Sequence, residues 1–123
     1  MITASCIALG GAFGALFRYS LCHAVNMACS ITFPIATLIV NLIGGFAMGL
    51  LTGYMTYKGM LPFNLKAFLI TGFLGGFTTF SAFSLDFVLL VEQGKWAHAF
   101  LYAFASISLS VLALVGGMEL MRH

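Results

Sequence analysis

The first 57 residues contain a single charged side chain, Arg18, and are otherwise mostly apolar. As one helix, at about 1.5 Å per residue, they would be far longer than the ~30 Å hydrocarbon core of a bilayer. The run must therefore fold back once. Of all 123 residues, 62% are hydrophobic and only 7% are charged, whereas soluble domains have about 25% charged residues. The sequence predicts an all-α integral membrane protein, with residues 1–123 forming one domain in a lipid bilayer.

Four apolar segments are long enough to cross the bilayer as helices. We expect these helices at residues 3–25, 35–57, 65–91 and 96–121. The N-terminus lacks a basic segment before its apolar run, so we expect the first span to stay uncleaved. Turn-forming residues separate the spans, in loops expected at 23–34 and 58–66: Asn26, Ser30, Thr32, Pro34, Gly59, Pro62 and Asn64.

Small and polar residues recur at four-residue spacing in the first two spans. Gly10 and Gly14 share a face with Arg18, and a stripe in the second span contains Thr37, Asn41, Gly45, Gly49 and Gly53. Glycines on such a stripe let another helix approach closely. Arg18 has two interpretations: anchoring with structural pairing, or direct attraction of an ion. Asn41 is costly in lipid, so it serves either as a hydrogen-bonding link between helices or as a neutral donor for an anion.

The third span contains the sequence GFLGGFTTFSAFS at residues 72–84. Three glycines and two adjacent threonines are unfavourable in a continuous helix, since each glycine costs about 1 kcal/mol relative to alanine, so we expect this helix to be broken in mid-membrane. Irregular backbone at that depth is tolerated only inside protein or along a wet cavity, which makes the break a candidate ion site. Phe80 and Phe83 follow it on one face, as core or as lining. Tyr102, Ser106 and Ser110 share a face of the fourth span.

Several functional classes are not expected. The chain has no H-E-x-x-H, G-x-S-x-G or C-x-x-C sequence, so we do not expect an enzyme. The net charge of +2, without a basic cluster, gives no reason to expect a nucleic-acid partner. The cysteines match no metal-binding spacing and are expected to be small buried apolar residues: Cys6, Cys22 and Cys29.

Two transport mechanisms stay open at this point. A small proton-coupled exporter would fit the size, but it needs an ionisable carboxylate within a span, and we expect Asp86 and Glu92 to lie toward the end of one. A passive pathway built from neutral donors fits better. Because four packed helices fill their own centre with side chains, a pore implies more than one copy.

The distribution of positive charge bears on orientation. One side of the membrane receives three basic residues and the other receives one or two: Lys58, Lys66 and Arg122 against Lys95 and, by its place in the first span, Arg18. This is a small bias under the positive-inside rule. Such a chain can insert in both directions and pair antiparallel.

Along nearly its whole length the chain resembles the Fluc-type fluoride channels, the bacterial CrcB family. Three motifs in order carry the match: GGAFGALFRY at 10–19, ATLIVNLIG at 36–44 and GFLGGFTTFSAF at 72–83. Ala36 and Ala82 depart mildly from the family pattern. The resemblance implies an antiparallel, dual-topology homodimer in the bacterial inner membrane, with two pores that export cytoplasmic fluoride down its electrochemical gradient.

The resemblance also implies roles for individual residues. Main-chain carbonyls of Gly75 and Thr78 from both subunits would hold one structural sodium ion (Na⁺) at the dimer centre. Arg18 would be a helix anchor or part of a vestibule. The fluoride pathway would consist of Asn41, Phe80, Phe83, Tyr102 and Ser110, together with Thr37 on the same stripe as Asn41.

Overall fold

The computed structural model describes residues 1–29 and 33–123. Its elements, in chain order, are α1 (Ile2–Ala28), α2 (Ile35–Tyr57), α3 (Phe63–Lys66), the π-helical segment η1 (Ala67–Leu74), α4 (Gly75–Phe77), α5 (Ser81–Glu92) and α6 (Trp96–Arg122). The elements α3 to α5 follow one another closely and act as a single span, Phe63–Glu92. The described chain therefore has four spans that are long and apolar enough to cross a membrane, as the sequence predicts.

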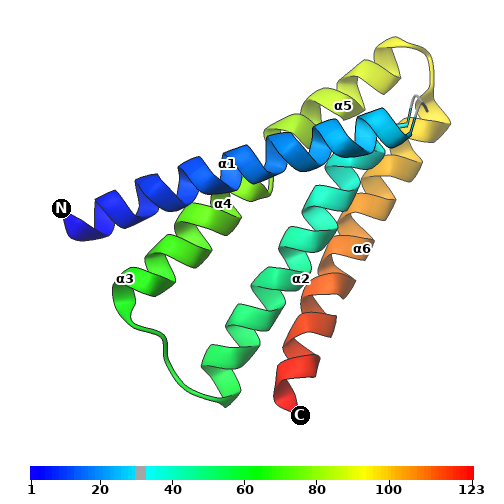
Figure 1. Cartoon of the computed structure of the whole chain (residues 1–123). Coiled ribbons are helices and arrows are strands. Elements are labelled where there is room, and N and C mark those ends of the chain that lie inside the picture. The colour runs from blue at the N-terminus through cyan, green and yellow to red at the C-terminus, as the bar shows by residue number, and fades with distance from the viewer. Residues whose placement is uncertain (30–32) are drawn as a thin grey trace.

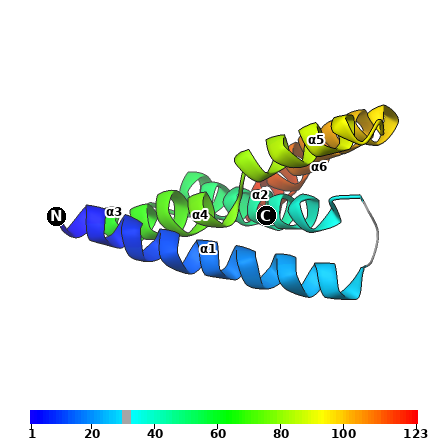
Figure 2. The same cartoon turned by 90° about the horizontal axis from the view of Figure 1, so that it is seen from above.

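The spans pack as two pairs (Figure 1). α1 lies along η1 and α4, whereas α2 lies along α6. After the third span is interrupted, α5 packs against α6. Figure 2 shows α1 on one side of α2 and the α5–α6 pair on the other. The two chain termini lie at the same end as the α2–α3 connection, and the α5–α6 turn lies at the opposite end.

Two helix boundaries differ from the sequence prediction. α1 continues to Ala28, past the expected end at residue 25. Asn26, which we expected in the loop, is accommodated in the last helical turn. Residues Phe63–Lys66 are helical rather than part of a loop. The amide oxygen of Asn64 accepts a 2.8 Å hydrogen bond from the Thr3 hydroxyl, so this residue is satisfied without interrupting the helix.

Two further expectations fall near the first connection. The turn residues Ser30 and Thr32 lie outside the described residues. Cys6 and Cys22 are half-buried, but Cys29 is exposed just beyond the end of α1. Among residues 1–29 and 33–123, the expectation of a buried thiol is therefore wrong for Cys29.

The glycine stripes are helix contacts, as predicted. A Cβ at Gly45 would lie 3.0 Å from the Ser110 carbonyl oxygen of α6, and a Cβ at Gly49 would overlap the carbonyl of Leu114. On α1, a Cβ at Gly14 would overlap the carbonyl of Phe73. Both helix pairs thus depend on backbone-to-backbone packing that only glycine permits.

The predicted break lies within the 72–84 stretch, but its glycines do not cause it. Gly72 and Gly76 are both helical. A Cβ at Gly76 would lie 2.7 Å from the carbonyl oxygen of Gly11, and one at Gly72 would lie 2.8 Å from that of Ile7. The close approach of α1 offsets the helix cost of these glycines, so they act as packing residues.

The interruption lies a few residues further on, at residues 78–80. Thr78 is extended, with φ −79° and ψ 158°, and helix resumes at Ser81. The Thr79 hydroxyl accepts a 3.1 Å hydrogen bond from the Ala82 N–H, which satisfies one free donor at the start of α5. Threonine leaves the helix here because its short polar side chain can cap the next one.

Candidate anion pathway and helix break

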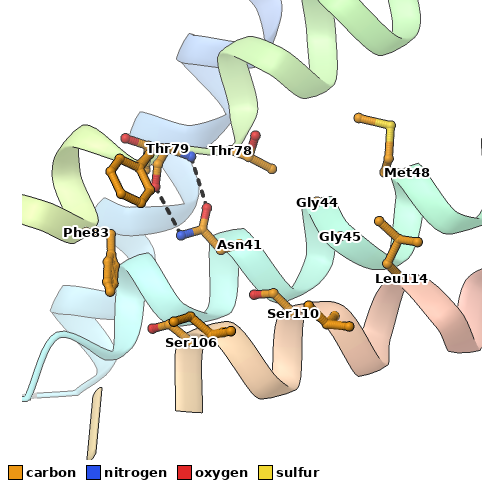
Figure 3. Close-up of a pocket in the computed structure, with 13 residues that line it drawn as sticks. Asn41, Gly44, Gly45, Met48, Thr78, Thr79, Phe83, Ser106, Ser110 and Leu114 are labelled. Carbon is orange, nitrogen blue, oxygen red and sulfur yellow. Dashed lines mark hydrogen bonds between the residues drawn. The ribbon is translucent and has the colours of Figure 1, made fainter. Parts of the chain in front are cut away.

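A cavity of about 550 Å³ lies between α2, α6 and the interruption of the third span (Figure 3). Its polar and aromatic lining consists of Asn41, Thr78, Thr79, Ser106, Ser110, Phe80 and Phe83. The structure therefore brings four of the predicted pathway residues to one cavity: Asn41, Phe80, Phe83 and Ser110. No charged side chain lines it within the described part of the chain.

Asn41 is paired with the backbone of the interrupted segment, as the dashed lines in Figure 3 show. Its Nδ2 donates to the Thr79 carbonyl at 3.1 Å, and its Oδ1 accepts from the Thr79 N–H at 2.9 Å. A side-chain amide has two N–H groups, so one remains for another acceptor. Asn41 thus links helices in this structure and keeps one donor at the cavity.

The two predicted phenylalanines belong to a stack of three rings. The ring centroids of Phe80 and Phe83 are 5.7 Å apart, and those of Phe83 and Tyr102 are 5.1 Å apart. Phe83 packs against the buried cluster of Leu90, Ala99 and Tyr102. Phe80, in contrast, is 81% exposed in the single chain. Phe83 is therefore both core and lining, and Phe80 is not core in one subunit.

Thr37 and Tyr102 lie at a second polar cluster rather than on the cavity wall. Both hydroxyls donate to Oδ2 of Asp86, at 2.8 Å and 3.2 Å. Asp86 lies toward the end of the third span, as the sequence predicts, but its contacts with two other spans were not predicted. Its partners come from α2 and α6, which the local sequence does not show. The signal was available, since a lone aspartate inside a span is costly and marks a functional site.

Ser106 is buried, and its hydroxyl has no hydrogen-bond partner among residues 1–29 and 33–123. It lines the same cavity as Ser110, one helical turn along α6. The face predicted from Tyr102, Ser106 and Ser110 therefore divides: Tyr102 binds Asp86, and the two serines reach the cavity.

The interruption leaves main-chain carbonyls free. The Thr79 N–H is directed to Asn41, and the Ala82 N–H is directed to the Thr79 hydroxyl. As a result, no donor in the described residues reaches the carbonyl oxygens of Gly75 and Thr78. The described chain also has no cluster of His, Cys, Asp or Glu that could hold a metal. Neutral oxygens without a carboxylate fit a hard monovalent cation better than a divalent ion.

Arg18 reaches the same segment from α1. Its half-buried Nε donates to the Gly76 carbonyl at 3.1 Å. Of the two interpretations of Arg18, structural pairing is the one that the structure displays. Thr78 is also hydrogen-bonded to the preceding helix. Its N–H and its hydroxyl both donate to the Leu74 carbonyl, at 2.9 Å and 2.8 Å.

Comparison with known proteins agrees with the resemblance. The family model described as CrcB-like protein, Camphor Resistance (CrcB), matches residues 5–118. A protein of Nitrobacter hamburgensis named fluoride-specific ion channel FluC 2 is 44% identical over 119 residues, which cover 94% of this chain and 93% of that protein. The fluoride-specific ion channel FluC of Magnetococcus marinus is 46% identical over 116 residues, 94% of each chain.

A third relative, the fluoride-specific ion channel FluC of Rhodopseudomonas palustris, is 42% identical over 114 residues, 93% of this chain and 92% of its own length. The names of all three describe ion channels, a non-enzymatic activity, which agrees with the absence of enzyme motifs. The four apolar spans identify a multi-pass membrane protein, and a location in the inner membrane is consistent with the bacterial relatives. The chain belongs to the CrcB family.

Proposed function

We propose that this protein is a fluoride-selective ion channel that lets cytoplasmic fluoride leave down its electrochemical gradient. The observation that carries the proposal is the cavity that joins Asn41, Phe80, Phe83 and Ser110 beside the interrupted span. The family membership supports it, because relatives matched over nearly their full length are named fluoride-specific ion channels.

The chemistry of the lining suits a small, strongly hydrated anion. Such an ion gives up its water shell only if donors replace it. Asn41 keeps one N–H free, and Ser110 lies on the same wall. A phenyl ring has a positive edge and a negative face, so Phe80 and Phe83 can receive the anion edge-on. A pathway without a fixed cation also lets the ion leave quickly, which conduction requires.

An antiparallel homodimer with two pores completes the proposal. In the single chain Phe80 is 81% exposed, so the cavity needs a second surface to exclude lipid. Arg18 is engaged inside the chain, which leaves three basic residues at one end against Lys95 at the other. That small difference is compatible with insertion in both directions.

A sodium ion between the two subunits is the proposed structural cofactor. The free carbonyls of Gly75 and Thr78 would hold it, with the same pair from the partner. When bound, the ion supplies positive charge that compensates carbonyl dipoles left without hydrogen bonds by the interruption. Within the described residues, neither of these two carbonyls accepts a hydrogen bond.

One observation favours a second candidate, a proton-coupled exporter. Asp86 is half-buried and contacts Thr37 of α2 and Tyr102 of α6, so a titratable carboxylate does lie among the spans. In an exporter, Asp86 would exchange protons during each transport cycle. In a channel, Asp86 would only hold the hydroxyls of Thr37 and Tyr102 in place through hydrogen bonds.

Fluoride efflux from liposomes that contain only the purified protein separates the two candidates. A channel releases fluoride when an ionophore for potassium balances the charge, and it does not raise the fluoride that a pH gradient loads into protein-free vesicles as neutral hydrogen fluoride. Chloride should be retained under the same conditions. Uphill fluoride movement driven by a pH gradient, beyond that seen in protein-free liposomes, would contradict the channel and support the exporter. The matched control is Asn41→Asp, which puts an anion at the pathway and should abolish efflux.

A further inference from the structure

Arg18 carries a half-buried positive charge beside the interrupted segment. Its Nε contacts the carbonyl of Gly76, which lies in the chain between Gly75 and Thr78. The one ion pair within residues 1–29 and 33–123 joins Arg122 to Glu119. In the described structure Arg18 is therefore held by a neutral carbonyl and not by a carboxylate.

The position of Arg18 is fixed by the packing of its helix. A Cβ at Gly14, one turn before Arg18, would overlap the carbonyl of Phe73 and lie 2.9 Å from the backbone nitrogen of Phe77. A Cβ at Gly76 would lie 2.7 Å from the carbonyl oxygen of Gly11. Because these backbones are in direct contact, α1 cannot slide relative to α4 without a clash. The guanidinium group is held at one place along the segment.

We propose that Arg18 is a specificity-determining residue that limits the cation at the helix break to a monovalent ion. This inference rests on the proposed cation site at Gly75 and Thr78. Arg18 acts in two ways. It donates a hydrogen bond to the carbonyl of Gly76, which makes that oxygen a weaker additional ligand. It also places a fixed positive charge near the free carbonyls, which repels a divalent cation twice as strongly as a monovalent one.

The experiment measures cation binding through stability and does not depend on transport. Purified dimers in detergent are titrated with sodium chloride or calcium chloride at matched ionic strength, and thermal unfolding and the dimer fraction are recorded, since a bound ion stabilises the folded dimer. Arg18→Gln keeps a side-chain donor for Gly76 and removes the charge, whereas Arg18→Lys keeps the charge. Arg122→Gln is the control, because its charge lies at the chain end and is paired.

The wild type should be stabilised by sodium and not by calcium. In Arg18→Gln, calcium should stabilise the dimer at a concentration at least about tenfold lower than in the wild type, because the like-charge repulsion is gone. Arg18→Lys and Arg122→Gln should both keep the monovalent preference.

Two different results would overturn the proposal, and they differ in whether the cation site is also rejected. An unchanged sodium-to-calcium preference in folded Arg18→Gln dimers rejects the role of Arg18 and leaves the cation site standing. Absence of any cation effect on the wild type rejects the site and the inference together. If Arg18→Gln does not assemble, the wild type and Arg18→Lys, together with Arg18→Met, decide the matter. Equal stabilisation of either of the first two by calcium and sodium rejects the proposal, and stabilisation of Arg18→Met dimers by calcium, where the wild type shows none, supports it.

Discussion

Replacing Asn41 with alanine should destabilise the protein by about 2–6 kcal/mol. The substitution removes both hydrogen bonds to Thr79, at 3.1 Å and 2.9 Å. It leaves one backbone N–H and one carbonyl without their partner, and each unsatisfied buried group costs about 1–3 kcal/mol. Thr79 lines the cavity, so water that enters there can replace part of the loss. We therefore expect a value in the lower half of this range.

The assay is equilibrium unfolding in detergent micelles, with the free energy of unfolding compared between variants. Asn64→Ala is the matched control, because Asn64 accepts a single exposed hydrogen bond from Thr3 and should change stability by less than about 0.5 kcal/mol. Asn41→Asp should fall between these two. It can still accept from the Thr79 N–H but presents a carboxylate to the Thr79 carbonyl.

A loss below about 0.5 kcal/mol in a folded Asn41→Ala variant would refute this reasoning, because a group that holds the interruption in place cannot be removed at the cost of an ordinary surface change. The same result would leave Asn41 free to act only as an anion donor.

Three further predictions concern packing, assembly and topology. Gly14→Ala should lose the folded protein in size-exclusion chromatography, whereas Gly116→Ala, with nothing within 4 Å of the added Cβ, should be neutral or stabilising by up to about 1 kcal/mol; equal behaviour of the two would contradict the helix contact. Thr78→Ser should assemble normally, since its backbone is the proposed ligand. Gly75→Leu should fold but fail to form cross-linked dimers, and its normal dimerisation would place the interface elsewhere. Terminal reporters should find both orientations of the chain in one membrane, and three lysines added to residues 58–62 should select one; a single orientation of the unmodified chain would exclude the antiparallel dimer.

The spans could be predicted because length and apolar composition leave a membrane chain few choices. The second helix was expected at residues 35–57 and is found at Ile35–Tyr57. The predicted boundaries are wrong at some helix ends, because a single polar residue there does not determine where a helix begins or ends. Residues Phe63–Lys66 are one example, because the contact of Asn64 with Thr3 joins positions far apart in the chain.

The interruption was predicted within residues 72–84 and lies there, but at the threonines and not at the glycines. Helix propensity counts each glycine as a cost, but Gly72 and Gly76 face α1 and are compensated by its close approach. The true break depends on Thr79, whose backbone pairs with Asn41, 38 positions away. No local pattern contains that pairing.

The candidate site could be predicted in part. Asn41, Phe80, Phe83 and Ser110 share one cavity, because helical spacing and the position of the break already relate them. Thr37 and Tyr102 separate from the others, since both bind Asp86. The position of Asp86 in the sequence did not indicate that its carboxylate contacts α2 and α6.

Fluoride efflux through Phe80→Leu and Phe83→Leu channels tests the proposed pathway most directly. Leucine has no ring quadrupole, so the positive edge that would receive the anion is lost. Phe104→Leu, at an exposed phenylalanine of α6 outside the cavity, is the control. We predict that efflux per folded dimer falls sharply in the first two variants and stays near the wild-type rate in the third. Wild-type rates in folded Phe80→Leu and Phe83→Leu dimers would show that the two rings only pack, and would contradict the pathway.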